Sequence, residues 1–431
     1  MIKKISPAQS LRGSITPPSD KSISQRAAIF SLLHEGSSVI KNYSEAEDPQ
    51  STLSCIEQLG AKVDRWGDKL QITGTGRNGI QRPYEDLDCG NSGTAMRLLS
   101  GVLAGSGVQA KLCGDESLSN RTMKRIIEPL ESMGAHILAR NSEFAPLMVS
   151  RNEPLRAIDY TLPIPSAQLK SCILLAGLFG KEPTRVVETV PSRDHTERIL
   201  GLKQQKIEGE TYIYSSLDDE IPAQNYTVPG DFSAASFWIV AGSVIPGSEI
   251  LIRNVGLNPS RTALLNILRR MGANIEIGNQ RTEGSEPVGD LVIRSASLTG
   301  TRIEQDIIPN CIDELPILSV AMLFAKGESI IMGAGELRHK ETDRLMAIGE
   351  MLDSASATYQ EYEEGIIIKG SPDHKYRSGL FKGFSDHRII MASAILALKA
   401  NKESHVMDYE KAAVSYPGFF EDLASLSVAG S

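Results

Sequence analysis

The chain has 431 residues, of which 41% are hydrophobic and 23% are charged, and its formal net charge is -8. This length exceeds one ordinary hydrophobic core, so we expect two or more domains. The acidic balance argues against a general binder of nucleic acid or of anionic membranes, so any basic site must be local.

The apolar stretches are too short to cross a bilayer. One of the longest, "CILLAGLFG" at 172–180, has about half the length that a membrane-spanning helix needs. The first residues, "MIKKISPAQS", lack the apolar core of a secretory signal. We therefore expect a cytoplasmic protein, and we expect a monomer.

The cysteines are odd in number, widely spaced and without a CxxC pair. We interpret them as buried small hydrophobes in a reducing compartment, the alternatives being disulfides or metal ligands. They are Cys55, Cys89, Cys113, Cys172 and Cys311.

The first predicted helix begins within "PPSDKSISQR" at 17–26, with Ser19 or Asp20 as its N-cap. Lys21 and Arg26 then place two cations in the first turns. A helix N-terminus carries partial positive charge, so a cation there is disfavoured by roughly 0.3–1 kcal/mol. Such an arrangement needs a reason.

Cations recur at later predicted helix starts. In chain order the segments are "GNSGTAMRLL" at 90–99, "LSNRTMKR" with Arg121, "PSRDHTER" with Arg193, "RHKETDRL" with Lys340 and Arg344, and "SDHRIIM" with Arg388. We expect Arg121 and Arg193 on first turns, and Lys340 and Arg344 as i,i+4 neighbours on one helix face. A solvated basic face explains any single case. Their repetition in an acidic protein favours a site for a ligand with several negative charges.

A repeated pattern runs through the whole chain. "CIEQLGAKV" at 55–63, "PLESMGAHI" at 129–137 and "ILRRMGANI" at 267–275 each combine an amphipathic helix end, a glycine C-cap and an apolar strand start. Six β-α-β-α-β-β units are the simplest interpretation, with a solenoid as the alternative. The expected first-helix caps lie 65 to 82 residues apart: Asp20, Asn91, Ser166, Asp231, Asp313 and Asp386.

The pattern also predicts two α/β domains. A boundary is expected near "NYTVPGDFSAAS" at 225–236, where Pro229 and Gly230 break the chain. Residues 1–18 should form a strand that packs with the second half, so that the chain crosses twice. The expected domains are residues 19–229, and residues 1–18 together with 230–431.

Acid–base candidates lie in the cation-rich segments. Glu341 lies between Lys340 and Arg344, and Asp313 begins an otherwise apolar helix for which a plain N-cap is the alternative role. His387 lies between Asp386 and Arg388 and is either structural or part of the site. "GTGRNG" at 74–79 is interpreted as a hairpin turn, and common nucleotide, zinc and serine-nucleophile motifs are absent from the sequence.

Together these motifs resemble the enolpyruvyl transferase family, and specifically its shikimate 3-phosphate branch. The resemblance runs from "SDKSISQRA" through "GNSGTAMR", "SAQLKS", "PSRDHTER" and "HKETDR" to "SDHRIIMA". It implies two similar domains, each of three βαβαββ units around a pseudo-threefold axis, with a substrate cleft between them. It also implies transfer of the enolpyruvyl group of phosphoenolpyruvate to the 5-hydroxyl of shikimate 3-phosphate, in aromatic amino acid biosynthesis, with neither cofactor nor metal.

The resemblance implies a role for each matching residue. Asp313 would be the base, with Lys21 as a second candidate, and Glu341 the acid. Shikimate 3-phosphate would be held by Lys21, Ser22, Arg26, Ser166, Gln168, Arg193, Asp313 and Lys340. Phosphoenolpyruvate would be held by Lys21, Asn91, Gly93, Arg121, Gln168, Arg344 and Arg388.

Some positions depart from the family pattern. Ala167 stands where many members have serine, Glu336 where some have asparagine, and Val414 where some have a lysine that Lys411 cannot be assumed to replace. The family is the target of glyphosate, for which Gly93 favours sensitivity. Leu98, the "SAQLKS" segment and Val414 favour tolerance, and we expect sensitivity of an intermediate degree.

Two alternatives stay open at this point. The related transferase that uses UDP-N-acetylglucosamine carries a loop cysteine just before the arginine that matches Arg121, whereas this loop reads "GDESLSNR". A non-catalytic phospho-ligand-binding protein is the second alternative, but it has no need of Asp313 and Glu341 beside the cations.

Overall fold

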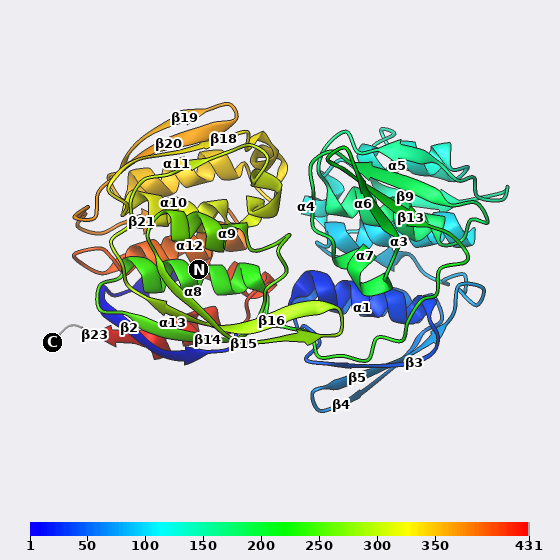
Figure 1. Cartoon of the computed structure of the whole chain (residues 1–431), viewed down its shortest axis with the longest axis horizontal. Helices are drawn as coiled ribbons and strands as arrows, with labels where there is room; N and C mark the ends of the chain where they lie inside the picture. Colours follow the sequence, from blue (N-terminus) through cyan, green and yellow to red (C-terminus); the bar gives the residue numbers. More distant parts are fainter. Residues whose placement is uncertain (430–431) are drawn as a thin grey trace. The chain divides into compact units, whose positions relative to one another are not determined.

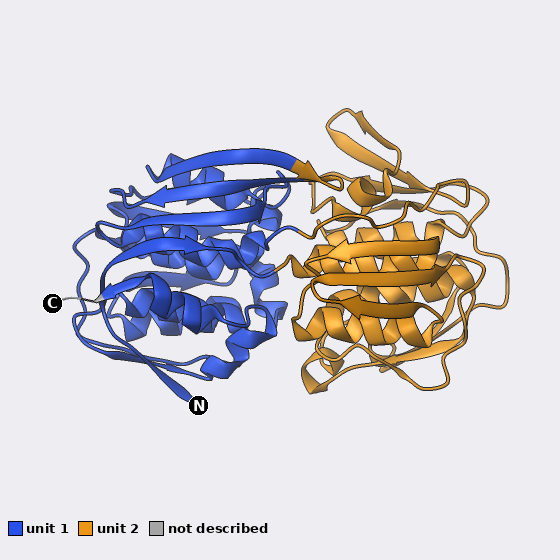
Figure 2. Cartoon of the chain, turned by 90° about the horizontal axis from the view of Figure 1, so that it is seen from below, with its two compact units in different colours: residues 1–18, 229–281, 287–431 blue, residues 19–228, 282–286 orange. Residues whose placement is uncertain are grey.

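The computed structural model describes residues 1–429 and divides the chain into two compact units (Figure 2). Unit 1 consists of residues 1–18, 229–281 and the chain from residue 287 onward, and unit 2 consists of residues 19–228 and 282–286. The sequence placed Pro229 with the first half, and it gave no sign that residues 282–286 separate from their neighbours. Each unit has its own hydrophobic core.

Unit 2 contains three successive repeats, several of whose helices and strands are labelled in Figure 1. The first repeat consists of α1 (Lys21–Leu33), β3 (Glu35–Lys41), α2 (Glu47–Gln58), β4 (Lys62–Trp66) and β5 (Lys69–Thr75). The second consists of β6 (Leu87–Asp88), α3 (Gly93–Ser106), β7 (Ala110–Cys113), α4 (Glu116–Ser119), α5 (Lys124–Ser132), β8 (His136–Arg140) and β9 (Phe144–Ser150). The third consists of β10 (Asp159–Thr161), α6 (Ala167–Gly177), β11 (Thr184–Glu188), α7 (His195–Leu200), β12 (Gln204–Ile207) and β13 (Glu210–Ser215).

Unit 1 contains the other three repeats and both N-terminal strands, β1 (Ile2–Ile5) and β2 (Ala8–Ile15). The fourth repeat consists of α8 (Phe232–Val244), β14 (Glu249–Gly256), α9 (Ala263–Arg270), β15 (Asn274–Glu283) and β16 (Glu286–Arg294). The fifth consists of β17 (Arg302–Ile303), η1 (Ile308–Asn310), η2 (Ile312–Glu314), α10 (Leu315–Leu323), β18 (Gly327–Met332), η3 (Gly335–His339), α11 (Arg344–Ser354), β19 (Thr358–Tyr362) and β20 (Gly365–Gly370). The sixth consists of β21 (Leu380–Phe381), α12 (His387–Ala397), β22 (Ser404–Met407), η4 (Tyr409–Val414), α13 (Phe419–Leu426) and β23 (Ser427–Ala429).

Three of the sheets share one strand order: β6-β7-β9-β8, β10-β11-β13-β12 and β17-β18-β20-β19. In each sheet the first two strands are parallel and the remaining neighbours are antiparallel. A parallel pair requires a crossover, which a helix provides here, and a hairpin then completes the sheet. The shared order confirms the predicted β-α-β-α-β-β unit.

The N-terminal strands explain why the chain passes twice between the units. β2 pairs in parallel with β14 and thereby supplies the first strand of the fourth repeat, while β1 pairs antiparallel with β22 of the sixth. The sheet of the first repeat has only three strands. In place of a fourth strand, Thr227 forms an isolated parallel bridge with Lys41, the last residue of β3. Residues 1–18 therefore form two strands rather than one.

Helix starts and ends follow the sequence closely. Asp20, Ser166, Asp231 and Asp386 cap α1, α6, α8 and α12 as predicted, each accepting a hydrogen bond from a backbone N–H of the first turn. The predicted glycines after α2, α5 and α9 have φ of 105°, 99° and 100°, the left-handed side that glycine tolerates best (Gly60, Gly134 and Gly272).

Some local predictions were wrong. Ser92, not Asn91, caps α3, and Asp313 lies in the 3-10 turn η2 ahead of α10 instead of capping it. Residues 74–79 lead from the end of β5 into a loop and do not join two strands. All five cysteines are thiols, four of them buried and Cys113 partly exposed.

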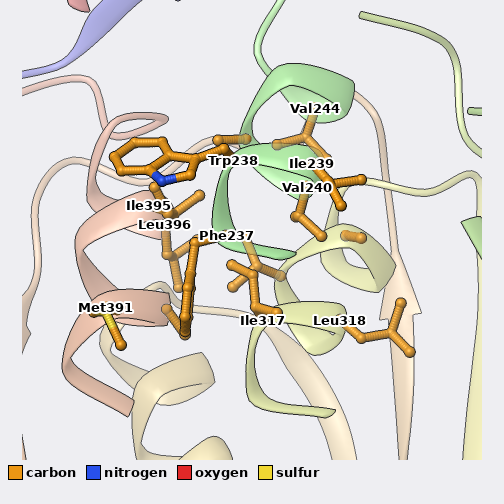
Figure 3. Close-up of a cluster of buried hydrophobic side chains, with 14 of the residues drawn as sticks. Phe237, Trp238, Ile239, Val240, Val244, Ile317, Leu318, Met391, Ile395 and Leu396 are labelled. Atoms are coloured by element: carbon orange, nitrogen blue, oxygen red, sulfur yellow. The ribbon is translucent and has the colours of Figure 1, made fainter. Parts of the chain in front are cut away.

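Helices that are apolar on all sides form the centre of each unit. In unit 1, every residue of α8, α10 and α12 is buried, and Phe237, Ile317 and Ile395 lie close together where these helices meet (Figure 3). In unit 2, α3 packs tightly on α6. Gly101 makes this close approach possible, since a Cβ at this position would collide with the carbonyl oxygen of Cys172. The starts of α3, α6 and α12, and the 3-10 turn before α10, also carry predicted site residues.

Candidate functional site

The predicted site residues form one cluster in each unit. In unit 2 they lie at or just before the starts of α1, α3, α5, α6 and α7. In unit 1 they lie on η2, on the segment between η3 and α11, and at the starts of α11 and α12. Each cluster combines several cations with carboxylates that hold them.

The start of α1 holds two of the predicted cations. The Lys21 ammonium lies 2.8 Å from the Asp48 carboxylate, and both side chains are mostly buried. Arg26 is 3% exposed and donates to the hydroxyls of Thr196 and Ser171, at 2.8 and 3.1 Å. Because burial outweighs the attraction of Glu197 and Asp20, it lowers the pKa of Arg26 to about 10.

The loop before α3 connects Asn91 with Arg121. The Arg121 guanidinium donates to the Asn91 amide oxygen at 2.9 Å, and the Asn91 amide nitrogen donates to Asp115 at 2.7 Å. Arg121 precedes α5 instead of lying on its first turn, since α5 begins at Lys124. The Gly93 backbone lies against this group, because a Cβ there would be 3.6 Å from a terminal nitrogen of Arg121.

The start of α6 is fixed by a residue that sequence reasoning missed. Arg97, which is 8% exposed, donates to the Gln168 side-chain oxygen at 2.5 Å, and the Gln168 amide donates to Thr94 at 2.9 Å. A signal was present, because Arg97 lies four residues after Gly93 on the same helix and therefore on the same face. Ser166 caps α6, and Ser22 is half-buried on the first turn of α1.

A buried charge cluster lies beneath these groups. Lys170, which is fully buried, lies 2.9 Å from Glu188 and 2.6 Å from Glu197. Burial lowers the pKa of Lys170, but the two carboxylates overcome this effect and raise it. Glu188 also accepts hydrogen bonds from the backbone and the hydroxyl of Ser192, next to Arg193. Arg193 is half-buried and precedes α7, which begins at His195.

In unit 1, Arg344 gathers three carboxylates. Its guanidinium lies 2.7 Å from Asp386, 2.5 Å from Glu341 and 3.3 Å from Asp313, while only 1% of its side chain is exposed. Burial lowers the pKa of Arg344, but Asp386, Glu341 and Asp313 raise it above its ordinary value. Two candidate acid–base groups thus share one cation.

Three further predicted residues belong to the same unit. Arg388 lies 3.6 Å from the second oxygen of Asp313, and it is on the first turn of α12 as predicted. His387 precedes it and is 4% exposed. Lys340 is half-buried, and desolvation lowers its pKa despite the opposing attraction of Asp313.

The predicted helical spacing of Lys340 and Arg344 was wrong. Lys340 ends the 3-10 helix η3, with extended backbone, whereas Arg344 begins α11 after the cap Asp343. The two cations therefore do not share a helix face. In the sixth repeat, Val414 is the last residue of η4, and Lys411 in the same turn is exposed.

Within residues 1–429, no group of three His, Cys, Asp or Glu side chains is arranged to hold a metal ion. In the same range, every helix is too short or too polar to cross a membrane.

The family model for EPSP synthase (3-phosphoshikimate 1-carboxyvinyltransferase) matches residues 5–423. The chain belongs to the EPSP synthase family. It is 48% identical to the 3-phosphoshikimate 1-carboxyvinyltransferase of Salinibacter ruber, with 99% of this chain and 100% of that protein covered. It is 45% identical to the protein of the same name from Syntrophomonas wolfei, with the same coverage.

Solved structures agree with this family assignment. EPSP synthase from Acinetobacter baumannii has a TM-score of 0.88 at 34% identity, with 99% of this chain and 98% of that chain covered. The enolpyruvyl transferase NikO from Streptomyces tendae has a TM-score of 0.74 at 14% identity, with 99% and 97% covered, and shows the shared fold alone. The chain is thus an enzyme of the 3-phosphoshikimate 1-carboxyvinyltransferase class with the predicted enolpyruvyl transferase fold.

Proposed function

We propose that this enzyme transfers the enolpyruvyl group of phosphoenolpyruvate to the 5-hydroxyl of shikimate 3-phosphate and releases inorganic phosphate. The family supports the reaction, and the arrangement of Arg344 with Asp313 and Glu341 carries the assignment of residues. The two carboxylates on this buried guanidinium place the base and the acid beside the same anion-binding group.

The residues of unit 2 and unit 1 serve the same two substrates. Shikimate 3-phosphate is held by Lys21, Ser22, Arg26, Ser166, Gln168, Arg193, Asp313 and Lys340. Phosphoenolpyruvate is held by Lys21, Asn91, Gly93, Arg121, Gln168, Arg344 and Arg388. Arginine suits this task because its planar fork matches the paired oxygens of carboxylate and phosphate. The cationic groups also stabilise the charges that the tetrahedral intermediate retains.

Asp313 removes the proton of the 5-hydroxyl, with Lys21 as a second candidate for the base, and the resulting oxygen attacks C2 of phosphoenolpyruvate. Glu341 delivers a proton to the methylene carbon, which becomes a methyl group in the tetrahedral intermediate. In the second step the methyl group loses a proton, the double bond forms again and phosphate leaves. The bonds formed and broken balance without a redox partner.

The ion pairs of Arg344 offer a way to couple binding to protonation. An incoming phosphate or carboxylate group competes with Glu341 for this guanidinium, because all three are anions. When its contact with Arg344 weakens, Glu341 holds a proton more readily and can act as the acid. Asp386 keeps Arg344 in place through a contact of 2.7 Å.

The decisive experiment measures phosphate release with each substrate alone and with both together, after chelation of metals. We expect release only with both substrates. Release with UDP-N-acetylglucosamine in place of shikimate 3-phosphate would contradict the proposal, as would dependence on added metal. A protein that binds both ligands and releases no phosphate would support the non-catalytic alternative.

We further propose that the enzyme acts as a monomer in the cytoplasm. Light scattering on the purified protein tests the first point, and a mass near 46.8 kDa is the expected result.

A further inference from the structure

One side chain of unit 1 joins the segment that carries Lys340 and Glu341 to a neighbouring hairpin. Arg338 lies on the 3-10 helix η3, two residues before Lys340, and 25% of its side chain is exposed. Its guanidinium contacts the end of β19, the turn that follows it and the cap of α11. Arg338 was not among the predicted site residues, so their proposed roles do not account for these contacts.

Arg338 uses each nitrogen of its guanidinium. Nε donates to the carbonyl of Glu363 at 2.8 Å, and Nη2 donates to the carbonyl of Tyr362 at 2.8 Å and to the carboxylate of Glu361 at 2.9 Å. Nη1 donates to the Asp343 carboxylate at 2.7 Å. The other oxygen of Asp343 accepts the backbone N–H of Met346 at 3.0 Å and so caps α11.

The segment on either side of Arg338 is anchored as well. The Ala334 N–H donates to the carbonyl of Glu364 at 2.8 Å, in the same β19–β20 turn, and Leu337 is fully buried. On the other side, Asp343 sets the start of the helix whose first residue is Arg344. Lys340 and Glu341 lie between these two anchors, on backbone that is neither helix nor strand.

We propose that Arg338 is a positioning residue for the enolpyruvyl transfer reaction, because it holds the 340–344 segment against the β19–β20 turn. It acts through Lys340, Glu341 and Arg344 and does not itself touch the substrates. The proposal rests on the function proposed above, since it assumes that these three residues act on the substrates. Lysine cannot replace the contacts fully, because a single ammonium lacks the planar fork.

The test compares Arg338→Met with Arg294→Met. Arg294 is a matched control in the same unit: it also joins two carboxylates, Glu249 at 2.8 Å and Glu276 at 2.7 Å, but it lies on β16 away from the predicted site residues. Hydrogen–deuterium exchange of amides 335–343 reports on the anchoring, and steady-state kinetics with both substrates report on positioning.

We expect faster exchange across 335–343 in Arg338→Met alone. We expect its kcat to fall on the order of 10- to 100-fold, by more than KM rises, because small displacements of catalytic groups are costly. Arg338→Lys should recover part of the lost kcat. If Arg338→Met does not fold, Glu361→Gln removes one contact and should produce a smaller change in the same direction.

Two results would overturn the proposal. Unchanged exchange across 335–343 would show that Arg338 does not hold the segment, and faster exchange with wild-type kcat would show that holding it does not matter for turnover. Failure of the proposed function itself is distinguishable, because it appears in the wild-type protein as absence of phosphate release with both substrates.

Discussion

Asp313 contacts two arginines, Arg344 at 3.3 Å and Arg388 at 3.6 Å, and is itself only partly exposed. A plain helix cap has no need of these neighbours, and the structure shows that Asp313 precedes the helix that it was thought to cap. The contacts place the Asp313 carboxylate beside two of the cations proposed to hold phosphoenolpyruvate, where the proposed base has to lie.

Asp313→Asn tests this role at the scale of a single residue. The amide keeps the size and the hydrogen-bonding oxygen but cannot act as a base. We expect kcat to fall about 10²–10⁴-fold, the usual contribution of positioned proton transfer, with little change in calorimetric affinity for shikimate 3-phosphate. Asp306→Asn, at an exposed position in the same unit, is the control and should keep full activity. Wild-type turnover in Asp313→Asn would show that another group is the base.

Gly93→Ala tests the close approach of the α3 loop to a ligand. A Cβ at this position would lie 3.0 Å from a terminal nitrogen of Arg97, which in turn holds Gln168. We expect inhibition by glyphosate to weaken more than KM for phosphoenolpyruvate rises, because glyphosate is the longer of the two ligands and tolerates less crowding. Inhibition constants measured in competition with phosphoenolpyruvate decide this. Gly278→Ala, where an added Cβ meets open space, should behave as wild type, and equal inhibition of all three proteins would remove the steric argument.

At the scale of secondary-structure elements, α6 joins site residues to the core. Its first residues include Gln168, its middle packs on α3 at Gly101, and its Lys170 pairs with Glu188 and Glu197. The position of Gln168 therefore depends on the packing of α6 against α3 and on the ion pairs of Lys170.

Lys170→Met should destabilise the protein in a pH-dependent way. Removing one partner of a buried ion pair costs about 3–5 kcal/mol, because the remaining charges stay buried. Burial already raises the pKa of Glu197, and loss of Lys170 raises it further. A carboxyl whose pKa is raised in the folded state binds its proton more tightly there than in the unfolded state, and this stabilisation disappears as the pH rises through the raised pKa. The loss of unfolding free energy in Lys170→Met should therefore grow as the pH rises.

Urea unfolding of Lys170→Met at about pH 5 and about pH 8 measures this difference, which should be larger at the higher pH. Lys111→Met removes the exposed pair with Asp86 and should change little at either pH. A pH-independent loss in Lys170→Met would indicate lost packing instead of uncompensated charge.

Gly101→Ala tests the contact between α3 and α6. The added methyl group collides with the Cys172 backbone, so the helices must separate, at roughly 1–3 kcal/mol for a strained core. Because the two helices carry Gly93 and Gln168, we also expect KM for phosphoenolpyruvate to rise. Urea unfolding and kinetics check both effects, and a variant with wild-type stability would show that the interface adapts freely.

At the scale of the whole molecule, the residues assigned to each substrate are divided between two units with separate cores. Shikimate 3-phosphate has most of its assigned residues in unit 2, whereas Asp313 and Lys340 belong to unit 1. The chain itself links the units at residues 18–19 and 228–229, and residues 282–286 of the β15–β16 hairpin belong to unit 2.

A thermal unfolding experiment can follow unit 1 by itself. The chain has two tryptophans, the exposed Trp66 in unit 2 and the fully buried Trp238 in unit 1, so fluorescence of Trp66→Phe reports on unit 1. We expect shikimate 3-phosphate with an unreactive phosphoenolpyruvate mimic to raise both this transition and the one seen by circular dichroism. At ligand concentrations near 100 Kd the gain should be about 2.7 kcal/mol. An unshifted Trp238 transition would mean that unit 1 does not bind these ligands.

The sequence by itself determined the repeats, most of the helix starts and the family. Capping by Asp20, Ser166, Asp231 and Asp386 could be predicted because a cap bonds to N–H groups two or three residues away, within the reach of local pattern. The roles proposed for these segments rest on the motifs that carry the family resemblance.

Only the tertiary structure decided which charges meet. Arg344 draws its carboxylates from positions 313, 341 and 386, and Arg97 reaches Gln168 from another helix. The sequence placed residues 1–18 with the second half of the chain, but only the structure shows that β2 pairs with β14. Ion pairs and strand pairs depend on distance in space, and packing of the helices around each core sets that distance. The number of residues between two positions does not predict it.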